Sequence, residues 1–263
     1  MKKIIIIPAR YHSTRFPGKP LVNIKGKSLI HRTWSLAKQI RSVDEVYIAT
    51  DNTEIQKHAD HFGANVIMTG DYKNGTERVH AAAQFLALAD EDQIINLQGD
   101  AVLTPPWVIQ ALADQTSDTD TTVMSTLAVA ITPEQYDAMQ LTKKQGIIGG
   151  TTVVFDKQQK ALYFSKAILP FIRNKSDRHL PMYRHIGLYA YSFATLKLYT
   201  SLAETNLEKA EGLEQLRALE NGIPVQVIIV DYQGRSHGSV DSPGDLSEIE
   251  SIIEKQGELI GLT

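Results

Sequence analysis

Short apolar runs alternate with amphipathic segments along the first part of the chain. The runs lie at residues 3–7, 45–50, 65–69 and 93–97, and segments 28–41, 53–62 and 76–89 between them carry apolar side chains at helical spacing. Alternating strands and helices form βαβ units, and continuously apolar strands are typical of a sheet that is covered on both faces. The pattern therefore predicts an α/β protein with a mostly parallel sheet flanked by helices.

The pattern becomes more irregular beyond residue 105. Two β-rich runs, 150–156 and 161–168, surround the polar turn 157–160 and predict a hairpin. The other expected elements are a helix from Pro106 to about Gln115, a strand at 121–130, a strand at 182–191, a helix at 208–221, a strand at 225–230 and a closing helix at 243–259. We expect a single domain over residues 1–263, with a β-rich subdomain inserted around 121–192.

Composition limits the functions that this chain can have. The 263 residues carry a formal net charge of -3, and the sequence pI is about 6.2, so the chain has no general basic field for nucleic acid. Cysteine is absent, which excludes disulfides, thiolate metal sites and cysteine nucleophiles. The apolar runs are too short to span a membrane. We expect a cytoplasmic protein with no nucleic-acid or membrane partner, whose cationic sites are local.

The stretch from Pro8 to Pro20 places three cations, Arg10, Arg15 and Lys19, directly after the first apolar strand. Ligands bind at the carboxyl ends of strands in open α/β sheets, and arginine forks bind phosphate oxygens in pairs. The stretch is not a Walker loop, because Ser13 stands where that motif needs glycine. It is either a phosphate-binding loop or a loop whose charges face water.

Two aspartates lie next to the ends of predicted elements, one just after a strand and the other just before a helix. Asp100 ends the segment Asn-Leu-Gln-Gly-Asp, and Asp241 precedes Ser242-Pro243 at the start of the last helix. Either could be a structural cap of a helix. Together with a cationic loop, however, two carboxylates indicate Mg²⁺ shared with a polyphosphate, because Mg²⁺ prefers carboxylate and phosphate oxygens.

Two further segments are candidates for ligand contacts. In Asn74-Gly75-Thr76-Glu77-Arg78, Gly75 permits close approach of a ligand to the backbone, although a capped surface helix would look the same. Farther along, Glu211, Glu214 and Gln215 lie on neighbouring faces of a predicted helix and could accept hydrogen bonds from a polyol. An ordinary exposed helix would again look similar.

The order of these motifs resembles the CMP-Kdo synthetase family, the cytidylyltransferases of 3-deoxy-manno-octulosonate (Kdo). The matching segments are I-P-A-R-Y-x-S-T-R-F-P-G-K-P at 7–20, A-T-D at 49–51, M-T-G-x5-G-T-E-R at 68–78, N-L-Q-G-D at 96–100, A-L-Y-F-S at 161–165, H-I-G-L-Y-A-Y at 185–191, E-x-L-E-Q-L-R at 211–217 and V-D-S-P-x-D at 240–245. The resemblance spans nearly the whole chain. It implies a Rossmann-like fold of the nucleotide-diphospho-sugar transferase type.

The resemblance also implies roles for individual residues. The residues implied to bind CTP are Pro8, Ala9, Arg10, Arg15, Lys19, Gly75, Arg78 and Gln98. The implied catalytic residues are Arg10, Arg15, Lys19 and Asp100, and the implied Mg²⁺ ligands are Asp100 and Asp241. The residues implied to bind the sugar are His185, Tyr189, Glu211, Glu214 and Gln215. The implied reaction transfers CMP from CTP to the anomeric hydroxyl of Kdo and releases pyrophosphate, in lipopolysaccharide biosynthesis. The family implies a homodimer, with the β-rich subdomain serving sugar binding and dimerisation.

Three departures from the family pattern surround the expected sugar site. Ala101 follows Asp100 where the family usually has glutamate, Lys166 stands in place of a usual arginine, and Gly149-Gly150-Thr151-Thr152 replaces an N-x-V-K-like run. Lysine offers a compact charge instead of a planar fork. The alternatives are therefore the same chemistry on 8-amino-Kdo or on a sialic-type acid, and a regulatory protein that binds CTP without turnover.

Overall fold

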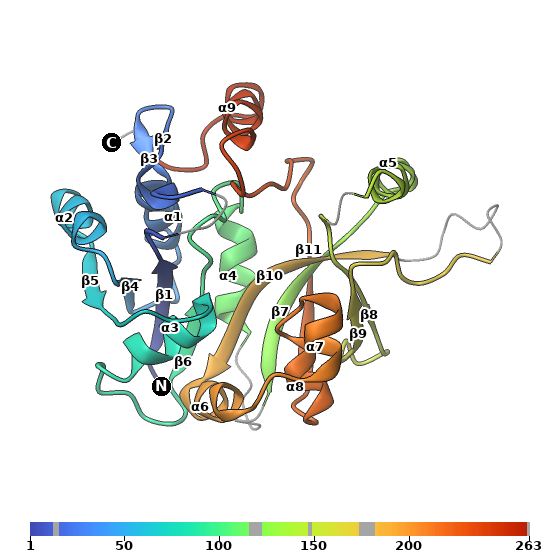
Figure 1. Cartoon of the computed structure of the whole chain (residues 1–263), viewed down its shortest axis with the longest axis horizontal. Helices are drawn as coiled ribbons and strands as arrows, with labels where there is room; N and C mark the ends of the chain where they lie inside the picture. Colours follow the sequence, from blue (N-terminus) through green and yellow to red (C-terminus); the bar gives the residue numbers. More distant parts are fainter. Residues whose placement is uncertain (13–15, 116–122, 147–148, 174–181, 262–263) are drawn as a thin grey trace.

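The computed structural model describes residues 1–12, 16–115, 123–146, 149–173 and 182–261. A central twisted sheet runs through the molecule, and helices cover it on both sides (Figure 1). Within the described residues, no helix has the length and apolar character that crossing a bilayer requires.

The main sheet has the strand order β11-β7-β10-β6-β1-β4-β5. Its strands are β1 (Lys3–Ala9), β4 (Glu45–Thr50), β5 (Asn65–Met68), β6 (Gln93–Asn96), β7 (Met124–Ala130), β10 (Tyr183–Ser192) and β11 (Val225–Val230). Neighbouring strands are parallel except at β10, which pairs antiparallel with both β6 and β7. The prediction of a mostly parallel, helix-flanked sheet is confirmed. The carboxyl ends of β1 and β6 lie side by side and define the edge where a ligand is expected.

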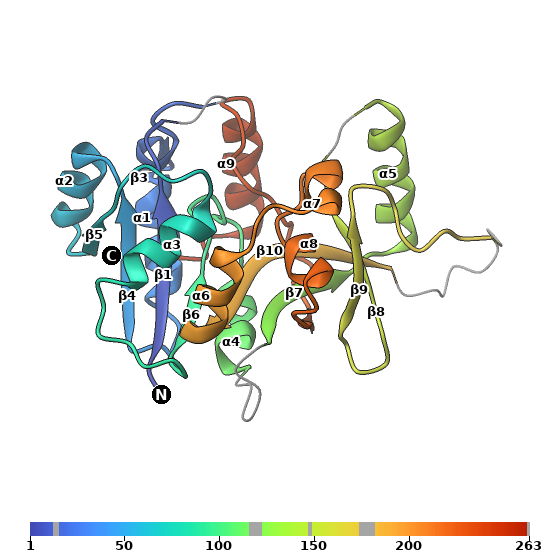
Figure 2. The same ribbon diagram turned by 60° about the horizontal axis from the view of Figure 1, so that its bottom comes forward.

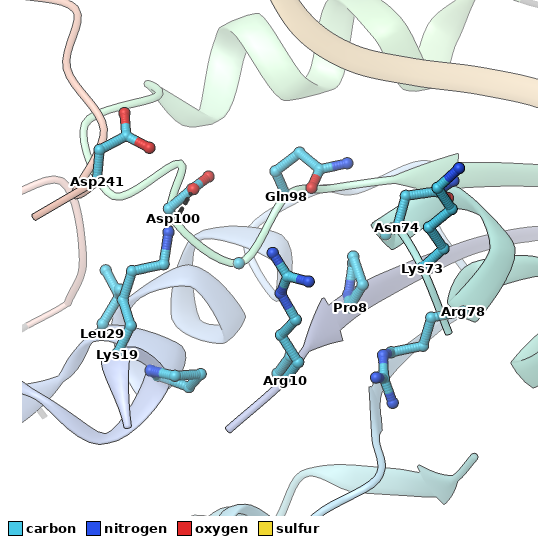
Figure 3. A pocket seen from close by; sticks show the side chains of 14 residues that line it. Pro8, Arg10, Lys19, Leu29, Lys73, Asn74, Arg78, Gln98, Asp100 and Asp241 are labelled. Carbon is cyan, nitrogen blue, oxygen red and sulfur yellow. Dashed lines mark hydrogen bonds and ion pairs between the residues drawn. The ribbon is translucent and has the colours of Figure 1, made fainter. Parts of the chain in front are cut away.

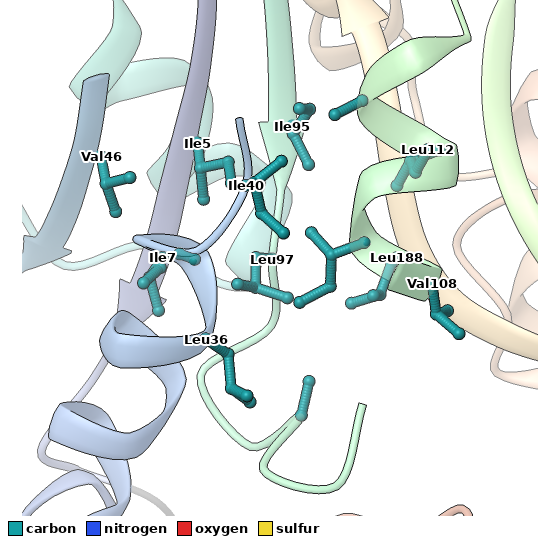
Figure 4. Packing of buried hydrophobic residues seen from close by; sticks show 14 of the residues in the cluster. Ile5, Ile7, Leu36, Ile40, Val46, Ile95, Leu97, Val108, Leu112 and Leu188 are labelled. Atoms are coloured by element: carbon teal, nitrogen blue, oxygen red, sulfur yellow. The ribbon is translucent and has the colours of Figure 1, made fainter. Parts of the chain in front are cut away.

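Apolar side chains from the two faces of the sheet form separate layers of core. On one face, Ile5, Ile7 and Ile95 pack with Leu36 of α1 (Leu29–Ala37) and Leu112 of α4 (Pro106–Asp114), as Figure 4 shows. The other face packs against α3 (Gly75–Ala83), α6 (Phe193–Ser201) and α8 (Leu216–Glu220). The remaining outer helices are α2 (Thr53–His61), α5 (Pro133–Lys144), α7 (Asn206–Glu211) and α9 (Asp245–Gln256). Burial of the strands on both faces explains their continuous apolar sequence.

The predicted hairpin is present as β8 (Thr152–Phe155) and β9 (Ala161–Ser165). It joins the main sheet where β8 pairs antiparallel with the start of β10. The hairpin and α5 lie at one end of the molecule, away from α2 and β5 (Figure 2). The β-rich insertion therefore exists, while its separate role as a subdomain stays a prediction.

Several element boundaries differ from the expectation. The helix expected at 208–221 is two helices, because Gly212 adopts a left-handed conformation with φ 63° that ends α7. The helix expected at 76–89 ends at Ala83. The structure also has α5, α6, the short 3₁₀ helix η1 (Lys19–Leu21) and a small hairpin of β2 (Asn23–Ile24) and β3 (Lys27–Ser28), none of which the sequence pattern predicted.

Candidate active site

A pocket of about 340 Å³ lies at the carboxyl ends of β1 and β6. Figure 3 shows side chains that converge on it from β1, from the loop after β6, from the start of α3 and from the segment before α9. The lining residues are Pro8, Ala9, Arg10, Lys19, Pro20, Leu29, Lys73, Asn74, Gly75, Arg78, Gln98, Gly99, Asp100 and Asp241. The pocket thus unites the predicted phosphate loop, the segment around Gly75 and both predicted metal-binding aspartates.

The first loop brings two of its three cations to the pocket. Arg10 is exposed, points into the pocket, and has no hydrogen bond or ion pair in the part of the chain that the structure describes (Figure 3). Lys19 donates to Asp100 Oδ2 at 2.7 Å and to the carbonyl of Val240 at 2.8 Å. Arg15 lies outside the described residues. Arg10 is therefore the cation with free donors, whereas Lys19 holds the walls of the pocket together.

The two aspartates occupy the same side of the pocket (Figure 3). Asp100 caps no helix, since α4 begins after Pro105, and its carboxylate is paired with Lys19. Asp241 accepts from the Ser239 hydroxyl at 3.2 Å, and its backbone N–H donates to Asp245 at 2.7 Å. The last helix begins at Asp245 after Gly244, so Asp241 is not its cap either. Neither aspartate is thus a helix cap, and both line the pocket.

Glycine at position 99 is required by the packing of the pocket floor. A Cβ at this position would lie 2.8 Å from the carbonyl oxygen of Pro8, closer than such atoms approach. The carbonyl of Gly99 in turn accepts from the Thr33 hydroxyl at 3.0 Å. At Gly75, a Cβ would lie 3.1 Å from Gln98 Oε1. Glycine at these two positions therefore lets the loop after β6 and the start of α3 approach Pro8 and Gln98 closely.

Arg78 lines the pocket, but its donors are already engaged. The guanidinium is 2% exposed and donates to Asp51 Oδ2 at 2.8 Å, to Thr69 Oγ1 at 2.7 Å and to the carbonyl of Gly70 at 3.2 Å. Figure 3 shows it turned away from Arg10. Arg78 therefore joins the ends of β4 and β5, and its predicted contact with the nucleotide stays a prediction.

Three of the predicted sugar-site residues form a buried polar cluster on one face of β10 and on α8. His185 is 8% exposed, and its Nε2 lies 2.9 Å from the Thr126 hydroxyl. Burial, aided by Lys166 and His237, lowers the pKa of His185 to about 3, so its imidazole is neutral. The Tyr189 hydroxyl donates to Gln215 Oε1 at 3.0 Å. Gln215 is 1% exposed, and its Nε2 has no partner among the described residues, so it offers a ligand a free donor.

The other two residues predicted for the sugar are carboxylates that already accept hydrogen bonds. Glu211 accepts from Ser165 Oγ at 2.7 Å and from the backbone N–H of Lys166 at 2.8 Å, which ties α7 to the end of β9. Glu214 accepts from the Thr76 hydroxyl at 3.0 Å. Withdrawal from water raises the pKa of Glu214 to about 6, although the Thr76 bond and Arg217 act in the opposite direction.

A chain of hydrogen bonds connects the pocket with this polar cluster, and the sequence did not reveal it. Gln98 Nε2 donates to Asn96 Oδ1 at 3.0 Å, and Asn96 Nδ2 donates to Thr76 Oγ1 at 3.1 Å. Thr76 then donates to Glu214, and Glu214 precedes Gln215 in the chain. Asn96 and Thr76 are 0% and 1% exposed. The two residues therefore fix the position of the pocket floor relative to α8.

Lys73 and Asn74 also line the pocket and were not predicted as site residues. Asn74 caps α3 through a 2.8 Å bond from the backbone N–H of Glu77. Their position just before Gly75 was the signal that could have revealed them. Across the described residues, no group of three or more acidic, histidine or cysteine side chains forms a complete metal site, so any ion here needs oxygens from a ligand.

Known proteins resemble this chain over almost its full length. The profile of the cytidylyltransferase family matches residues 4–229. A 3-deoxy-manno-octulosonate cytidylyltransferase of Maricaulis maris is 47% identical, over 99% of this chain and 100% of its own. An 8-amino-3,8-dideoxy-manno-octulosonate cytidylyltransferase of Shewanella pealeana is 40% identical, over 96% of this chain and 99% of its own.

A solved structure agrees in fold as well as in sequence. It is that of CMP:2-keto-3-deoxy-manno-octonic acid synthetase complexed with CTP, and it matches with a TM-score of 0.84 and 33% identity over 97% of this chain and 100% of its own. A family match across most of the chain, relatives of high identity and a shared fold all agree with the resemblance read from the sequence. The chain belongs to the cytidylyltransferase family, together with the CMP-Kdo synthetases.

Proposed function

We propose that this protein is a 3-deoxy-manno-octulosonate cytidylyltransferase. It transfers CMP from CTP to the anomeric hydroxyl of Kdo and releases pyrophosphate. The observation that carries the proposal is the pocket in which the free guanidinium of Arg10, the Lys19–Asp100 pair and Asp241 converge. Relatives with the same named activity, and a related structure with CTP bound, support it.

The residues of the pocket supply charge and positioning for this transfer. Arg10 binds phosphate oxygens of CTP and stabilises the negative charge that develops on the leaving pyrophosphate. The hydroxyl of the sugar attacks the α-phosphorus, the bond from that phosphorus to the bridging oxygen breaks, and the hydroxyl proton leaves to solvent. Lys19 holds Asp100 in place, and Gly99 lets the pocket floor approach Pro8. Fixing both reactants in line is the main source of acceleration in such a transfer.

The donor set fits Mg²⁺. One carboxylate oxygen of Asp100 accepts from Lys19, and its other oxygen is free within the described part of the chain. Asp241, in the segment before α9, contributes a second carboxylate. Two carboxylates completed by phosphate oxygens and water are a usual environment for this ion. When bound, Mg²⁺ would neutralise phosphate charge and orient the reacting groups. Asp100 and Asp241 are the residues that would hold it.

Kdo is the preferred sugar in this proposal, and 8-amino-Kdo is the second candidate because one close relative carries that name. The structure gives different surroundings to the two departures from the family pattern at positions 101 and 166. Ala101 is 8% exposed and packs in the hydrophobic core, so it does not line the pocket. Lys166 is half-buried and bonded through its backbone to Glu211, beside the polar cluster of His185. Of these two positions, Lys166 is therefore the one that can affect the choice of sugar.

We further propose that the protein is a cytoplasmic homodimer that supplies activated sugar for lipopolysaccharide. Large apolar side chains are exposed in the β-rich part of the chain: Leu141 on α5 is 60% exposed, Leu162 on β9 is 63% exposed and Phe171 is 86% exposed. Large apolar side chains exposed to this degree are candidates for burial in a protein–protein interface. They support an interface between two copies on this part of the molecule.

The proposed reaction is tested by pyrophosphate release from CTP, Mg²⁺ and a panel of Kdo, 8-amino-Kdo and a sialic acid. We expect Kdo to give the highest kcat/KM and Asp100→Asn to reduce turnover about a hundredfold or more, because the amide cannot replace a charged ligand of Mg²⁺. Asp60→Asn, on the exposed face of α2, is the matched control and should behave as wild type. Binding of CTP without pyrophosphate release from any sugar would favour the regulatory alternative.

A further inference from the structure

A second cavity of about 560 Å³ lies between α5, α9 and the end of β7. Its walls include Arg184 of β10, Tyr232 and His237 of the segment after β11, Met139 of α5 and Ile252 of α9. It shares no lining residue with the pocket of Arg10, and Figure 1 shows α5 and α9 separated along the top of the molecule. We call this cavity the α5–α9 cleft.

Arg184 lines this cleft with a cationic side chain, and the same lining includes the acidic residue Glu248. In the part of the chain that the structure describes, its guanidinium has no ion pair or hydrogen bond. The side chain of Arg184 is half-buried, and burial lowers its pKa. Three fully buried arginines each have a carboxylate: Arg32 has Glu258, Arg78 has Asp51 and Arg217 has Glu208. Charges withdrawn from water are normally paired, so an anion from outside the chain would give Arg184 the partner that it lacks among the described residues.

Other groups of the cleft add unused hydrogen-bonding capacity. Nδ1 of His237 is buried and has no partner among the described residues, while the ring packs 5.6 Å from that of Tyr232. Burial, together with Arg184, lowers the pKa of His237 to about 4, so the imidazole is neutral. Lys143 lies beside the cleft and donates to the carbonyls of Gly149 and Gly150 in its lining; burial first, and then repulsion by Lys166 and Arg184, lowers the pKa of Lys143. The cleft therefore combines positive potential with a free imidazole nitrogen.

We propose that the α5–α9 cleft binds a small organic acid, whose carboxylate is held by the guanidinium of Arg184 and whose polar body reaches His237. A carboxylate matches the planar fork of arginine in two parallel hydrogen bonds. Glu248 also lines the cleft, and apolar side chains such as Met139 and Ile252 face it. The acidic residue and the apolar side chains in the lining disfavour binding of a polyphosphate and favour a ligand of low charge. The inference does not depend on the transfer reaction proposed above.

Binding is measured by calorimetry with D-gluconate, a hydroxylated monocarboxylate, as the probe and with inorganic phosphate as the comparison anion. Wild type and Asp100→Asn should both bind gluconate, because the cleft is separate from the pocket of Asp100. Arg184→Gln should weaken gluconate binding at least tenfold. Arg41→Gln, which removes an exposed cation elsewhere, should leave it unchanged. Tighter binding of phosphate than of gluconate would contradict a carboxylate site.

The Arg184→Lys variant controls for a loss of binding that is caused by misfolding, since it keeps the charge and removes only the planar fork of arginine. We expect it to bind gluconate more weakly than wild type and more tightly than Arg184→Gln. Thermal unfolding of each variant confirms that it is folded, and removal of an uncompensated charge should not lower the melting temperature. The proposal is overturned if wild type does not bind gluconate, or if Arg184→Gln binds it as tightly as wild type does.

Discussion

At the scale of the residue, the site depends on side chains whose charges are either free or firmly engaged. Arg10 has free donors, Lys19 is held by Asp100, and Arg78 is held by Asp51. The two arginines thus have different tasks, although both line the pocket. An arginine with free donors can bind a ligand, whereas one with engaged donors maintains the shape of the site.

Arg10→Ala should raise the KM for CTP about 10- to 100-fold and leave the fold intact, because it removes charge-assisted hydrogen bonds of roughly 1.5 to 3 kcal/mol from an exposed side chain. Steady-state kinetics with varied CTP provide the measurement. Arg41→Ala, another exposed arginine, is the control and should keep the wild-type KM. An unchanged KM in Arg10→Ala would mean that this cation does not contact the nucleotide.

Glu214→Gln should change how stability depends on pH. The folded pKa of Glu214 is about 6 and the unfolded pKa is about 4.3, so between these values the folded chain binds more protons. The free energy of unfolding therefore falls as pH rises through this window, by about 1 to 2 kcal/mol. The variant lacks this fall in the free energy of unfolding, because its amide does not titrate. The amide oxygen can still accept the hydrogen bond from Thr76.

Urea unfolding of wild type and Glu214→Gln at pH 4 and pH 7 tests this expectation. His185 and His237 titrate in both proteins, so the difference between the two proteins isolates Glu214. Glu220→Gln, at an exposed position on α8, is the control and should follow wild type. Parallel pH profiles for wild type and Glu214→Gln would show that the carboxylate is not destabilised by the fold.

At the scale of the element, a buried ion pair joins α7 and α8. Arg217 of α8 donates to Glu208 of α7 at 2.8 and 2.6 Å, and the two side chains are 4% and 10% exposed. The same guanidinium stacks over Tyr199, 5.1 Å from its ring. Because α8 carries Gln215 at its start, this pair positions the free amide donor of the polar cluster.

Glu208→Ala should lower the free energy of unfolding by about 3 to 5 kcal/mol, because it leaves the charge of Arg217 buried without a partner. Chemical denaturation is the measurement. Glu54→Ala removes the exposed pair of Glu54 with Lys57 and should cost less than about 1 kcal/mol. Equal effects of the two variants would mean that burial does not distinguish the pairs.

The elements also show what the sequence could predict. Strands β1, β4 and β6 were predicted closely because burial leaves them a nearly continuous apolar run, and the edge strand β5, which is only partly buried, still keeps three apolar residues in a row. Helix α5 was missed because it has no buried residue and hence no apolar stripe. The break at Gly212 was missed because its flanking residues continue a helical pattern, and only the left-handed backbone ends the helix.

The residues of the site likewise divide into those that the sequence could predict and those that it could not. Arg10, Lys19, Asp100 and Asp241 were recognisable as charged residues next to strand or helix ends. Asn96 and Thr76 were not, because a buried asparagine or threonine looks like any strand or capping residue. Their role depends on contact with Glu214, which is remote in sequence. Pairings of this kind are decided by the tertiary fold and leave no local pattern.

At the scale of the whole molecule, we expect the β-rich part to form the interface of a homodimer. Phe171→Glu should shift the protein from dimer to monomer, since it places a charge among the apolar groups proposed to be buried between two copies. Sedimentation velocity gives the oligomeric state directly. Phe85→Glu, at a position 72% exposed just after α3, is the control and should leave the dimer intact. A wild-type protein that sediments as a monomer would contradict the proposed homodimer.

The antiparallel strand β10 has a consequence for the order in which the molecule can be built. Strands β1, β4, β5 and β6 pair only with one another until β10 arrives, so this half of the sheet can assemble as soon as residues 3–96 have left the ribosome. Strand β7 must wait, because both of its neighbours, β10 and β11, are translated later. Until then its edges are open to wrong partners. Slow translation between β7 and β10 would therefore favour misassembly of the second half, while the first half of the sheet is already in place.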